Sequence, residues 1–194
     1  DGWVAWVNSG DVYLYDGLTT RRLTYDGSNS GPQINDRGDV AWMNNSDGDY
    51  EIFMFNSDSE SVSQITNNNS DDVFDQDNNY PPLNFNSLGQ IIWVHGDSFS
   101  EREIHLFDGS TTTILTANGF YDDLPSISEN GHAVWRGNGQ IFYYDGSTIT
   151  QLTSGGFLKD EPKIGPSGNA VWMDWVDGHL NAEIYFYDQI SDQV

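Results

Sequence analysis

Hydrophobic residues occur along this chain in short runs, and each run is closed by a turn rich in Gly, Asn, Asp and Ser. Residues 32–66 show the pattern clearly, with apolar runs at 40–43 and 52–55. Such runs, rich in β-branched and aromatic residues, are typical of β-strands. In the run 52–55 successive side chains point to opposite faces, and both faces are apolar. No stretch has the 3.6-residue period of a helix. The pattern therefore predicts an all-β protein whose small sheets are covered on both faces.

The unit 32–66 recurs along the whole chain with its anchors in a fixed order. A Trp marks the second predicted strand of every copy, at Trp6, Trp42, Trp93, Trp135 and Trp172. A Pro marks the first strand of four copies, at Pro32, Pro82, Pro125 and Pro162. Four short strands per repeat of about 40 residues are typical of a β-propeller blade. We therefore expect a single β-propeller domain over 1–194, with units at 1–31, 32–81, 82–124, 125–161 and 162–194, in which the Trp residues pack between blades.

The order of these anchors resembles a known family. The pattern P-x-[IL]-x-x-x-G-x-[AV]-x-W, followed by [DE]-[IV]-[FY] and [LI]-T, is similar to the repeats of TolB-type propellers. The resemblance covers nearly the whole chain and implies the propeller fold. It implies no single function, because that fold hosts periplasmic scaffolds, peptidase caps and carbohydrate-active proteins. The chain departs from the family at Asn35, Asn86, Glu129 and Pro166, where the family often has Ser-Pro-Asp, so the chemistry of that turn is not carried over.

The two ends of the sequence fall inside repeats. The first unit has no first strand, and the last unit ends after its third strand. These gaps do not complement each other in one shared blade. Two architectures follow, a five-bladed ring or a segment of a larger propeller or repeat protein, and the incomplete end units favour the segment.

The charge of the chain restricts its partners. It has 30 acidic and 7 basic residues, for a net charge of −23. Nucleic acid is excluded as a partner because phosphate binding needs a basic face, and anionic membranes are disfavoured for the same reason. No apolar run is long enough for membrane insertion, and cysteine is absent, which excludes disulfides and thiolate metal sites. The composition suits a secreted, periplasmic or cell-surface protein kept soluble by surplus acid. Its expected partner is a protein or a neutral glycan, with this chain as part of a larger chain or assembly.

Acidic residues gather just before three of the repeat prolines. They are Asp71, Asp72, Asp75, Asp77, Asp122, Asp123, Asp160 and Glu161. In a radial arrangement of blades these side chains converge near one mouth of the central channel. Converging carboxylates repel one another unless a hard cation joins them, and Ca²⁺ takes six to eight oxygen ligands. The sequence thus predicts a calcium site at these residues. The alternative is that the acids cap turns and face solvent.

Aromatic residues lie in the same linkers as these acids. They are Tyr80, Phe120, Tyr121 and Phe157. Aromatic faces beside oxygen acceptors or Ca²⁺ suit a carbohydrate-binding site, and repetition would add avidity. The alternative is that these rings fill the seams between blades.

The signs of catalysis are weak. The four histidines (His95, His105, His132 and His179) have no i, i+2 or i, i+4 partner, so their spacing predicts no transition-metal site. No G-x-S-x-G motif is present. The predicted innermost strands, at 33–35, 83–85, 126–128 and 163–165, carry no acid, which disfavours a glycosidase with paired carboxylates.

We therefore predict a non-enzymatic propeller that acts outside the cell or at its surface as a binding module or structural scaffold. A calcium-assisted, lectin-like carbohydrate-binding propeller is the first alternative. A polysaccharide-active enzyme is the second.

Overall fold

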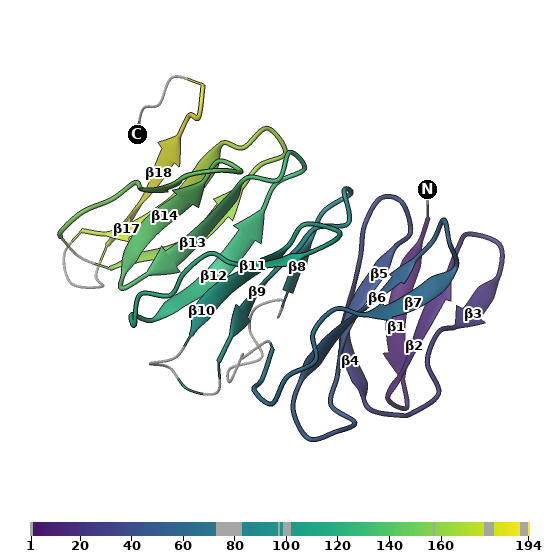
Figure 1. Ribbon diagram of the computed structural model, residues 1–194. Coiled ribbons are helices and arrows are strands. Elements are labelled where there is room, and N and C mark those ends of the chain that lie inside the picture. Colours follow the sequence, from purple (N-terminus) through teal and green to yellow (C-terminus); the bar gives the residue numbers. More distant parts are fainter. Residues whose placement is uncertain are drawn as a thin grey trace.

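Five small antiparallel sheets follow one another along the chain (Figure 1). The computed structural model describes residues 2–72, 83–96, 98, 102–156, 158–176, 181–190 and 194. Each sheet is a meander in which strands adjacent in sequence pair with each other. The described residues form no helix, and so include none that could cross a membrane. The predicted all-β propeller architecture is confirmed.

The first two sheets cover the N-terminal part of the chain. Sheet 1 consists of β1 (Val4–Asn8), β2 (Asp11–Tyr15) and β3 (Thr20–Arg22). Sheet 2 consists of β4 (Asn29–Ile34), β5 (Val40–Asn44), β6 (Glu51–Asn56) and β7 (Ser61–Gln64).

Three further sheets complete the described chain. Sheet 3 consists of β8 (Leu83–Phe85), β9 (Ile91–His95), β10 (Glu103–Phe107) and β11 (Thr112–Ile114). Sheet 4 consists of β12 (Asp122–Ile127), β13 (Ala133–Gly137), β14 (Gln140–Tyr144) and β15 (Ile149–Gln151). Sheet 5 consists of β16 (Lys159–Ile164), β17 (Ala170–Trp175) and β18 (Ala182–Tyr187).

The first strands of sheets 2, 4 and 5 carry an irregularity at their proline. The register of β4, β12 and β16 shifts there, and the preceding residue has positive φ: Gly31 at 58°, Leu124 at 53° and Glu161 at 48°. Proline has no N–H for the ladder, so a bulge removes it from the pairing. Each strand consequently begins three residues before its proline.

This geometry corrects two predictions. The linkers before Pro32, Pro125 and Pro162 end earlier than expected, because the last three residues before each proline belong to β4, β12 or β16. The prediction that the innermost strands carry no acid was also wrong. The structure places Asp122 and Asp123 in β12, and Asp160 and Glu161 in β16.

The repeated Trp forms the core of each junction between sheets. Trp42, Trp93, Trp135 and Trp172 are at most 2% exposed, and each packs in a cluster with residues of the preceding sheet. This confirms their predicted place between blades. In sheets 2, 4 and 5 an aromatic ring of the third strand stacks on the Trp: Phe53, Phe142 and Tyr185.

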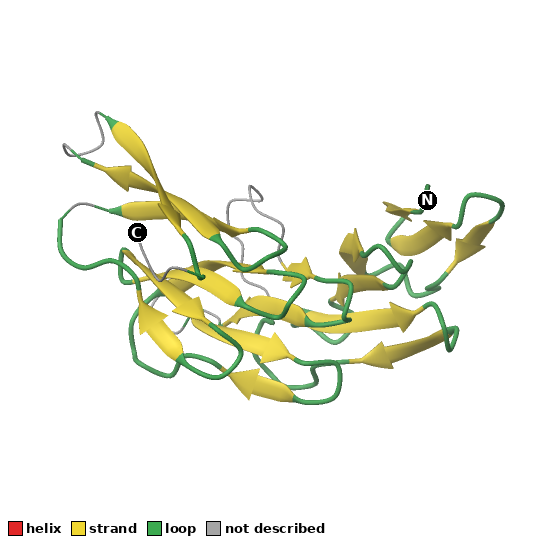
Figure 2. Ribbon diagram, turned by 90° about the horizontal axis from the view of Figure 1, so that it is seen from above, coloured by secondary structure: helices red, strands yellow, loops and turns green. Residues whose placement is uncertain are grey.

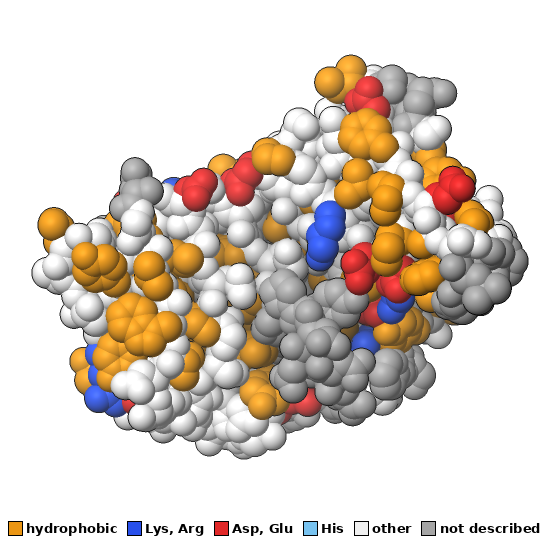
Figure 3. Space-filling view, turned by 180° about the vertical axis from the view of Figure 1, so that it is seen from behind, with side chains coloured by type: hydrophobic (Ala, Val, Ile, Leu, Met, Phe, Trp, Pro, Cys, Tyr) orange, Lys and Arg blue, Asp and Glu red, His pale blue; other side chains and the backbone are white. Residues whose placement is uncertain are grey.

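The five sheets lie along an open arc with the two termini at opposite ends (Figure 2). Hydrophobic side chains gather at both ends of the arc on the face seen from behind (Figure 3). In the last sheet, Ile184 is 70% exposed and Phe186 is 51% exposed. In the first sheet, Trp6 is half-buried and stacks on Tyr13. The described sheets thus form a propeller segment and do not close into a five-bladed ring.

Candidate functional site

The candidate residues lie along one edge of the sheets, which we call the rim. Here the start of a first strand, or in sheet 3 the isolated bridge at Asp72, lies opposite the end of the second strand, so two residues face each other across the ladder. These cross-strand pairs, the rim pairs, are Asn29–Asn44, Asp72–His95, Asp122–Gly137 and Lys159–Asp174. The first member of every pair is at least nine-tenths buried.

A backbone hydrogen bond ties every rim pair to the preceding sheet. The N–H of the first member donates to a carbonyl just before β2, β6, β10 or β14. The acceptors are Gly10, Tyr50, Arg102 and Gly139, at 2.9, 2.8, 3.2 and 3.1 Å. Because this contact recurs at all four described junctions, the rim pairs belong to the structural connection between sheets.

The side chains of three rim pairs are chemically complementary. The Asn44 amide donates to Asn29 Oδ1 at 2.9 Å. The Lys159 ammonium donates to Asp174 Oδ1 at 2.7 Å. His95 Nδ1 lies 2.8 Å from Asp72 Oδ1. The same buried position therefore holds an amide pair, an ion pair or an acid–imidazole pair. In each of these pairs the buried polar groups are hydrogen-bonded to each other.

The threonines that close the repeats support the same edge. Their Oγ1 atoms accept the backbone N–H of the second residue of β2, β6, β10 or β14, at 2.8–2.9 Å in all four copies: Thr24, Thr66, Thr116 and Thr153. The indole N–H groups of Trp42 and Trp93 donate to the first rim-pair residues Asn29 and Asp72, both at 2.9 Å. The repeat Thr residues, together with Trp42 and Trp93, therefore make their hydrogen bonds at the rim.

The fourth rim pair joins an acid to a glycine. Asp122 is fully buried, and a Cβ atom on Gly137 would lie only 2.2 Å from its Oδ1. Burial, together with the nearby carboxyl of Glu103, raises the pKa of Asp122 to about 6. Within the described chain, Asp122 Oδ1 and Glu103 Oε2 have no hydrogen-bond donor. Burial therefore favours the protonated form of the Asp122 carboxyl.

Two histidines that are distant in sequence meet at the second rim pair. The pairing of β9 with β10 sets His95 opposite Glu103, two residues from His105 and on the same face. The imidazole rings stack with centroids 4.5 Å apart. Ligand atoms of Asp72, His95 and His105 all lie within 4.8 Å of one another. Sequence spacing missed this cluster because it depends on the register of the hairpin.

A second charged cluster centres on Arg136, at the junction of sheets 4 and 5. Its guanidinium binds Asp123 through Nε (2.7 Å) and Nη2, and binds Asp160 through Nη1 at 2.6 Å. The Tyr121 hydroxyl donates to Asp123, and Arg102 lies over the Tyr121 ring at 5.3 Å. Burial and the Asp123 carboxylate raise the pKa of Tyr121. Acidic and basic side chains lie together on the rear face in Figure 3.

The structure separates most of the predicted calcium ligands. Asp72 lies at the junction of sheets 2 and 3, Asp122 and Asp123 at the junction of sheets 3 and 4, and Asp160 at the junction of sheets 4 and 5. Asp123 and Asp160 meet on Arg136. Asp71 accepts the backbone N–H of Tyr50 at 3.0 Å. Calcium binding stays a prediction.

The remaining candidates have varied surroundings. Glu161 occupies the bulge of β16, and Phe120 is 54% exposed, whereas Tyr121 lies within the Arg136 cluster. Asp75, Asp77, Tyr80 and Phe157 lie outside the described residues.

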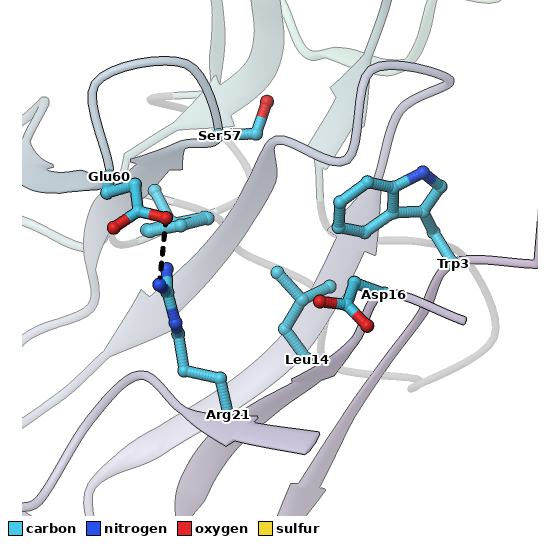
Figure 4. Close-up of a pocket in the computed structure, with 7 residues that line it drawn as sticks. Trp3, Leu14, Asp16, Arg21, Ser57 and Glu60 are labelled. Atoms are coloured by element: carbon cyan, nitrogen blue, oxygen red, sulfur yellow. Dashed lines mark hydrogen bonds and ion pairs between the residues drawn. The ribbon is translucent and has the colours of Figure 1, made fainter. Parts of the chain in front are cut away.

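A shallow pocket lies away from the rim, between sheets 1 and 2 (Figure 4). It measures about 350 Å³ including the part open to solvent. Arg21 and Glu60 form a 2.9 Å ion pair across it, and Trp3 lies on the opposite side. Asp16, also in its lining, accepts the backbone N–H groups of Leu18 and Thr19, which lower its pKa. The polar groups of this pocket are thus engaged in local contacts.

Sequence comparison finds no match for this chain among protein-family models or curated proteins. Structural comparison finds propellers. TolB from Acinetobacter baumannii matches with a TM-score of 0.57 and 14% identity, over 94% of this chain and 47% of that one. Dipeptidyl peptidase 4 from Porphyromonas gingivalis matches with a TM-score of 0.66 and 13% identity, over 97% and 36%. A chain of a nidogen–laminin complex matches with a TM-score of 0.53 and 14% identity, over 94% and 73%.

These likenesses concern the fold alone, because the identities are low. This chain spans about half the length of the Acinetobacter TolB and about a third of the peptidase. Proteins of varied function share the architecture. The resemblance to TolB-like propellers expected from the repeat is confirmed at the level of fold.

Proposed function

We propose that this chain is a non-enzymatic propeller module that binds a protein or a neutral glycan, or serves as a scaffold, outside the cytoplasm. The observation that carries the proposal is that charged rim residues form ion pairs with one another at a junction between sheets. The Arg136 guanidinium bridges Asp123 and Asp160 across a sheet junction, with side chains 14%, 7% and 21% exposed. Groups engaged and shielded in this way hold sheets together and are poorly placed to meet a substrate.

The surface supports binding over catalysis. Phe120 projects from the rim between β11 and β12 and is 54% exposed. An exposed aromatic ring offers a contact for a sugar face or for an apolar side chain of a partner. The net charge of −23 favours partners that are neutral or basic. The match to a chain of a nidogen–laminin complex shows the same fold within a protein complex.

The test combines an activity screen with a binding screen on the same preparation. Peptide, ester and polysaccharide substrates are assayed for turnover, and binding is read from a glycan array and an array of extracellular proteins. We expect no turnover, and at least one ligand whose binding falls tenfold or more in F120S. The matched control is L18A, which removes an 89% exposed side chain from the opposite edge and should leave binding unchanged.

Catalysis would contradict the proposal. The decisive result is product release by the wild type that is lost in E161Q while the variant keeps its thermal unfolding midpoint. Absence of both turnover and binding would leave only the scaffold role. In that case F120S and wild type should give the same scattering profile.

A further inference from the structure

Sheet 3 departs from the repeat in β10, where a histidine replaces a recurring Phe or Tyr. In the other sheets an aromatic ring of β2, β6, β14 or β18 stacks nearly parallel to the repeat Trp: Tyr13, Phe53, Phe142 and Tyr185. In sheet 3 this position is His105, which meets Trp93 edge-on and stacks on His95 instead. His95 in turn is the second member of its rim pair.

His105 places a polar imidazole where sheets 2 and 4 place the apolar ring of Phe53 or Phe142. A Phe at this position would pack without losing solvation. The histidine therefore suggests a chemical use beyond packing.

The surroundings match those of a metal site. Neutral imidazole and carboxylate together favour zinc and similar divalent ions, whereas calcium prefers oxygen ligands alone. The Asp72 carboxylate is held by the Trp93 indole at 2.9 Å and by the Asn68 amide. Ligating carboxylates are commonly fixed by such outer hydrogen bonds. The buried Glu51 accepts the backbone N–H of Asn68, the residue whose side-chain amide binds Asp72.

We propose that Asp72, His95 and His105 form a binding site for one divalent transition-metal ion, such as Zn²⁺, at the junction of sheets 2 and 3. Three ligands of a tetrahedral zinc lie about 3.3 Å from one another, given metal–ligand bonds of about 2.0–2.1 Å. His95 Nδ1 and Asp72 Oδ1 lie 2.8 Å apart, and one ligand atom from each of the three residues lies within 4.8 Å of the others, so small side-chain adjustments would bring them to the spacing of zinc ligands.

Three protein ligands leave a fourth position for water or for a group from a partner. The site would link the end of β9 to the segment before β8 and to β10. Metal binding would thereby stabilise the folded state of the junction.

The test is calorimetric titration of the whole chain with Zn²⁺, together with the absorption spectrum of the Co²⁺ form. H105F installs the residue that sheets 2 and 4 carry, and H95N installs the residue that sheet 2 carries in its rim pair, so both variants keep the fold of the repeat. H132Q removes a histidine of sheet 4 and is the matched control. We expect one Zn²⁺ per chain in wild type and H132Q, and a tenfold or greater loss of affinity in H105F and H95N.

The Co²⁺ form should show the intense visible bands of four-coordinate geometry, and these bands should be absent in H105F. Equal Zn²⁺ affinity in folded H105F and wild type would mean that surface carboxylates hold the ion, and it would overturn the proposal. Displacement of Zn²⁺ by an equal concentration of Ca²⁺ would overturn it as well. Neither result bears on the binding-module proposal, which rests on Phe120 and the Arg136 cluster.

Discussion

At the scale of single residues, the buried Asp122 carboxyl restricts the size of the side chain at position 137, where the chain has glycine. Its place in a rim pair is held elsewhere by Asn44, His95 or Asp174, yet here a Cβ atom would lie 2.2 Å from Asp122 Oδ1 and 3.0 Å from the Phe142 ring. Asp122 is fully buried within sheet 4 and cannot move outward without opening the junction. The glycine therefore leaves the room that the Asp122 carboxyl requires.

We predict that G137A lowers the free energy of unfolding by about 1–3 kcal/mol, because overpacking a buried site forces backbone shifts. The control is G165A, where the nearest atom to an added Cβ is 3.7 Å away. Urea denaturation measures both variants. Equal stability of G137A and G165A would show that Asp122 has space to move.

The pH dependence of stability should contain two opposing contributions. The pKa of Asp122 is raised from 3.8 to about 6, so the folded state binds this proton more tightly and stability falls as pH rises from about 4 to 6. Burial and the charge of His95 lower the pKa of His105 from 6.5 to about 4, whereas the Asp72 carboxylate acts in the opposite direction. The unfolded state binds that proton more tightly, so stability rises with pH over the same range.

Single variants should separate these contributions. In D122N the His105 contribution remains, so the free energy of unfolding is expected to rise between pH 4 and 6.5. In H105F the Asp122 contribution remains, so the free energy of unfolding is expected to fall over that range. Each change is on the order of 2 kcal/mol, since one pKa unit corresponds to about 1.4 kcal/mol. Urea denaturation at half-unit pH steps measures the slopes. Identical slopes in both variants and wild type would contradict the assigned pKa directions.

At the scale of elements, the repeated Trp plays the same packing role in every junction but differs in its hydrogen bond. Trp93 and Trp135 are both fully buried. The Trp93 indole donates to Asp72, whereas the Trp135 indole has no acceptor among the described residues. The two positions therefore form a natural pair for separating packing from hydrogen bonding.

We expect W93F to cost more stability than W135F, by about 1–2 kcal/mol, because W93F also removes a donor from a buried carboxylate. The loss of ring volume is the same in both variants. Thermal and urea unfolding of the two proteins at pH 7 measure the difference. A larger cost for W135F would mean that cavity formation, and not the indole hydrogen bond, dominates.

The sequence predicted elements well where a local pattern decides them. The Trp anchors and the alternation of Ile52 with Phe53 were enough to place the strands and their two apolar faces. The bulges were missed because a proline was taken as the start of its strand. The meeting of His95 with His105 and of Arg136 with Asp160 could not be predicted, since it depends on hairpin register and on contacts between sheets.

At the scale of the whole molecule, the five sheets form an open arc with unequal ends (Figure 2). In the last sheet Ile184 and Phe186 are exposed. In earlier sheets the corresponding face is buried against the next sheet. In the first sheet Trp6 is only half-buried, whereas its counterparts are buried against the preceding sheet. The shape of the chain in solution should reflect this open arrangement.

Small-angle scattering should give a radius of gyration above the roughly 16 Å expected for a compact domain of this length. Light scattering on the same sample must report a monomer for the comparison to hold. A monomer at or below that radius, with the symmetric distance distribution of a closed disc, would contradict the open arc.

The claim on which this account depends is that charged rim residues join neighbouring sheets. A double-mutant cycle on Arg136 and Asp160, which lie in β13 and β16, tests it most directly. The variants are R136Q, D160N and the double variant, and the free energy of unfolding of each is measured in urea. We predict a coupling energy of about 1–3 kcal/mol, because the pair is largely shielded and shares a network with Asp123. Additive effects, within about 0.5 kcal/mol, would show that Arg136 and Asp160 do not act together and would contradict the structural role assigned to the rim.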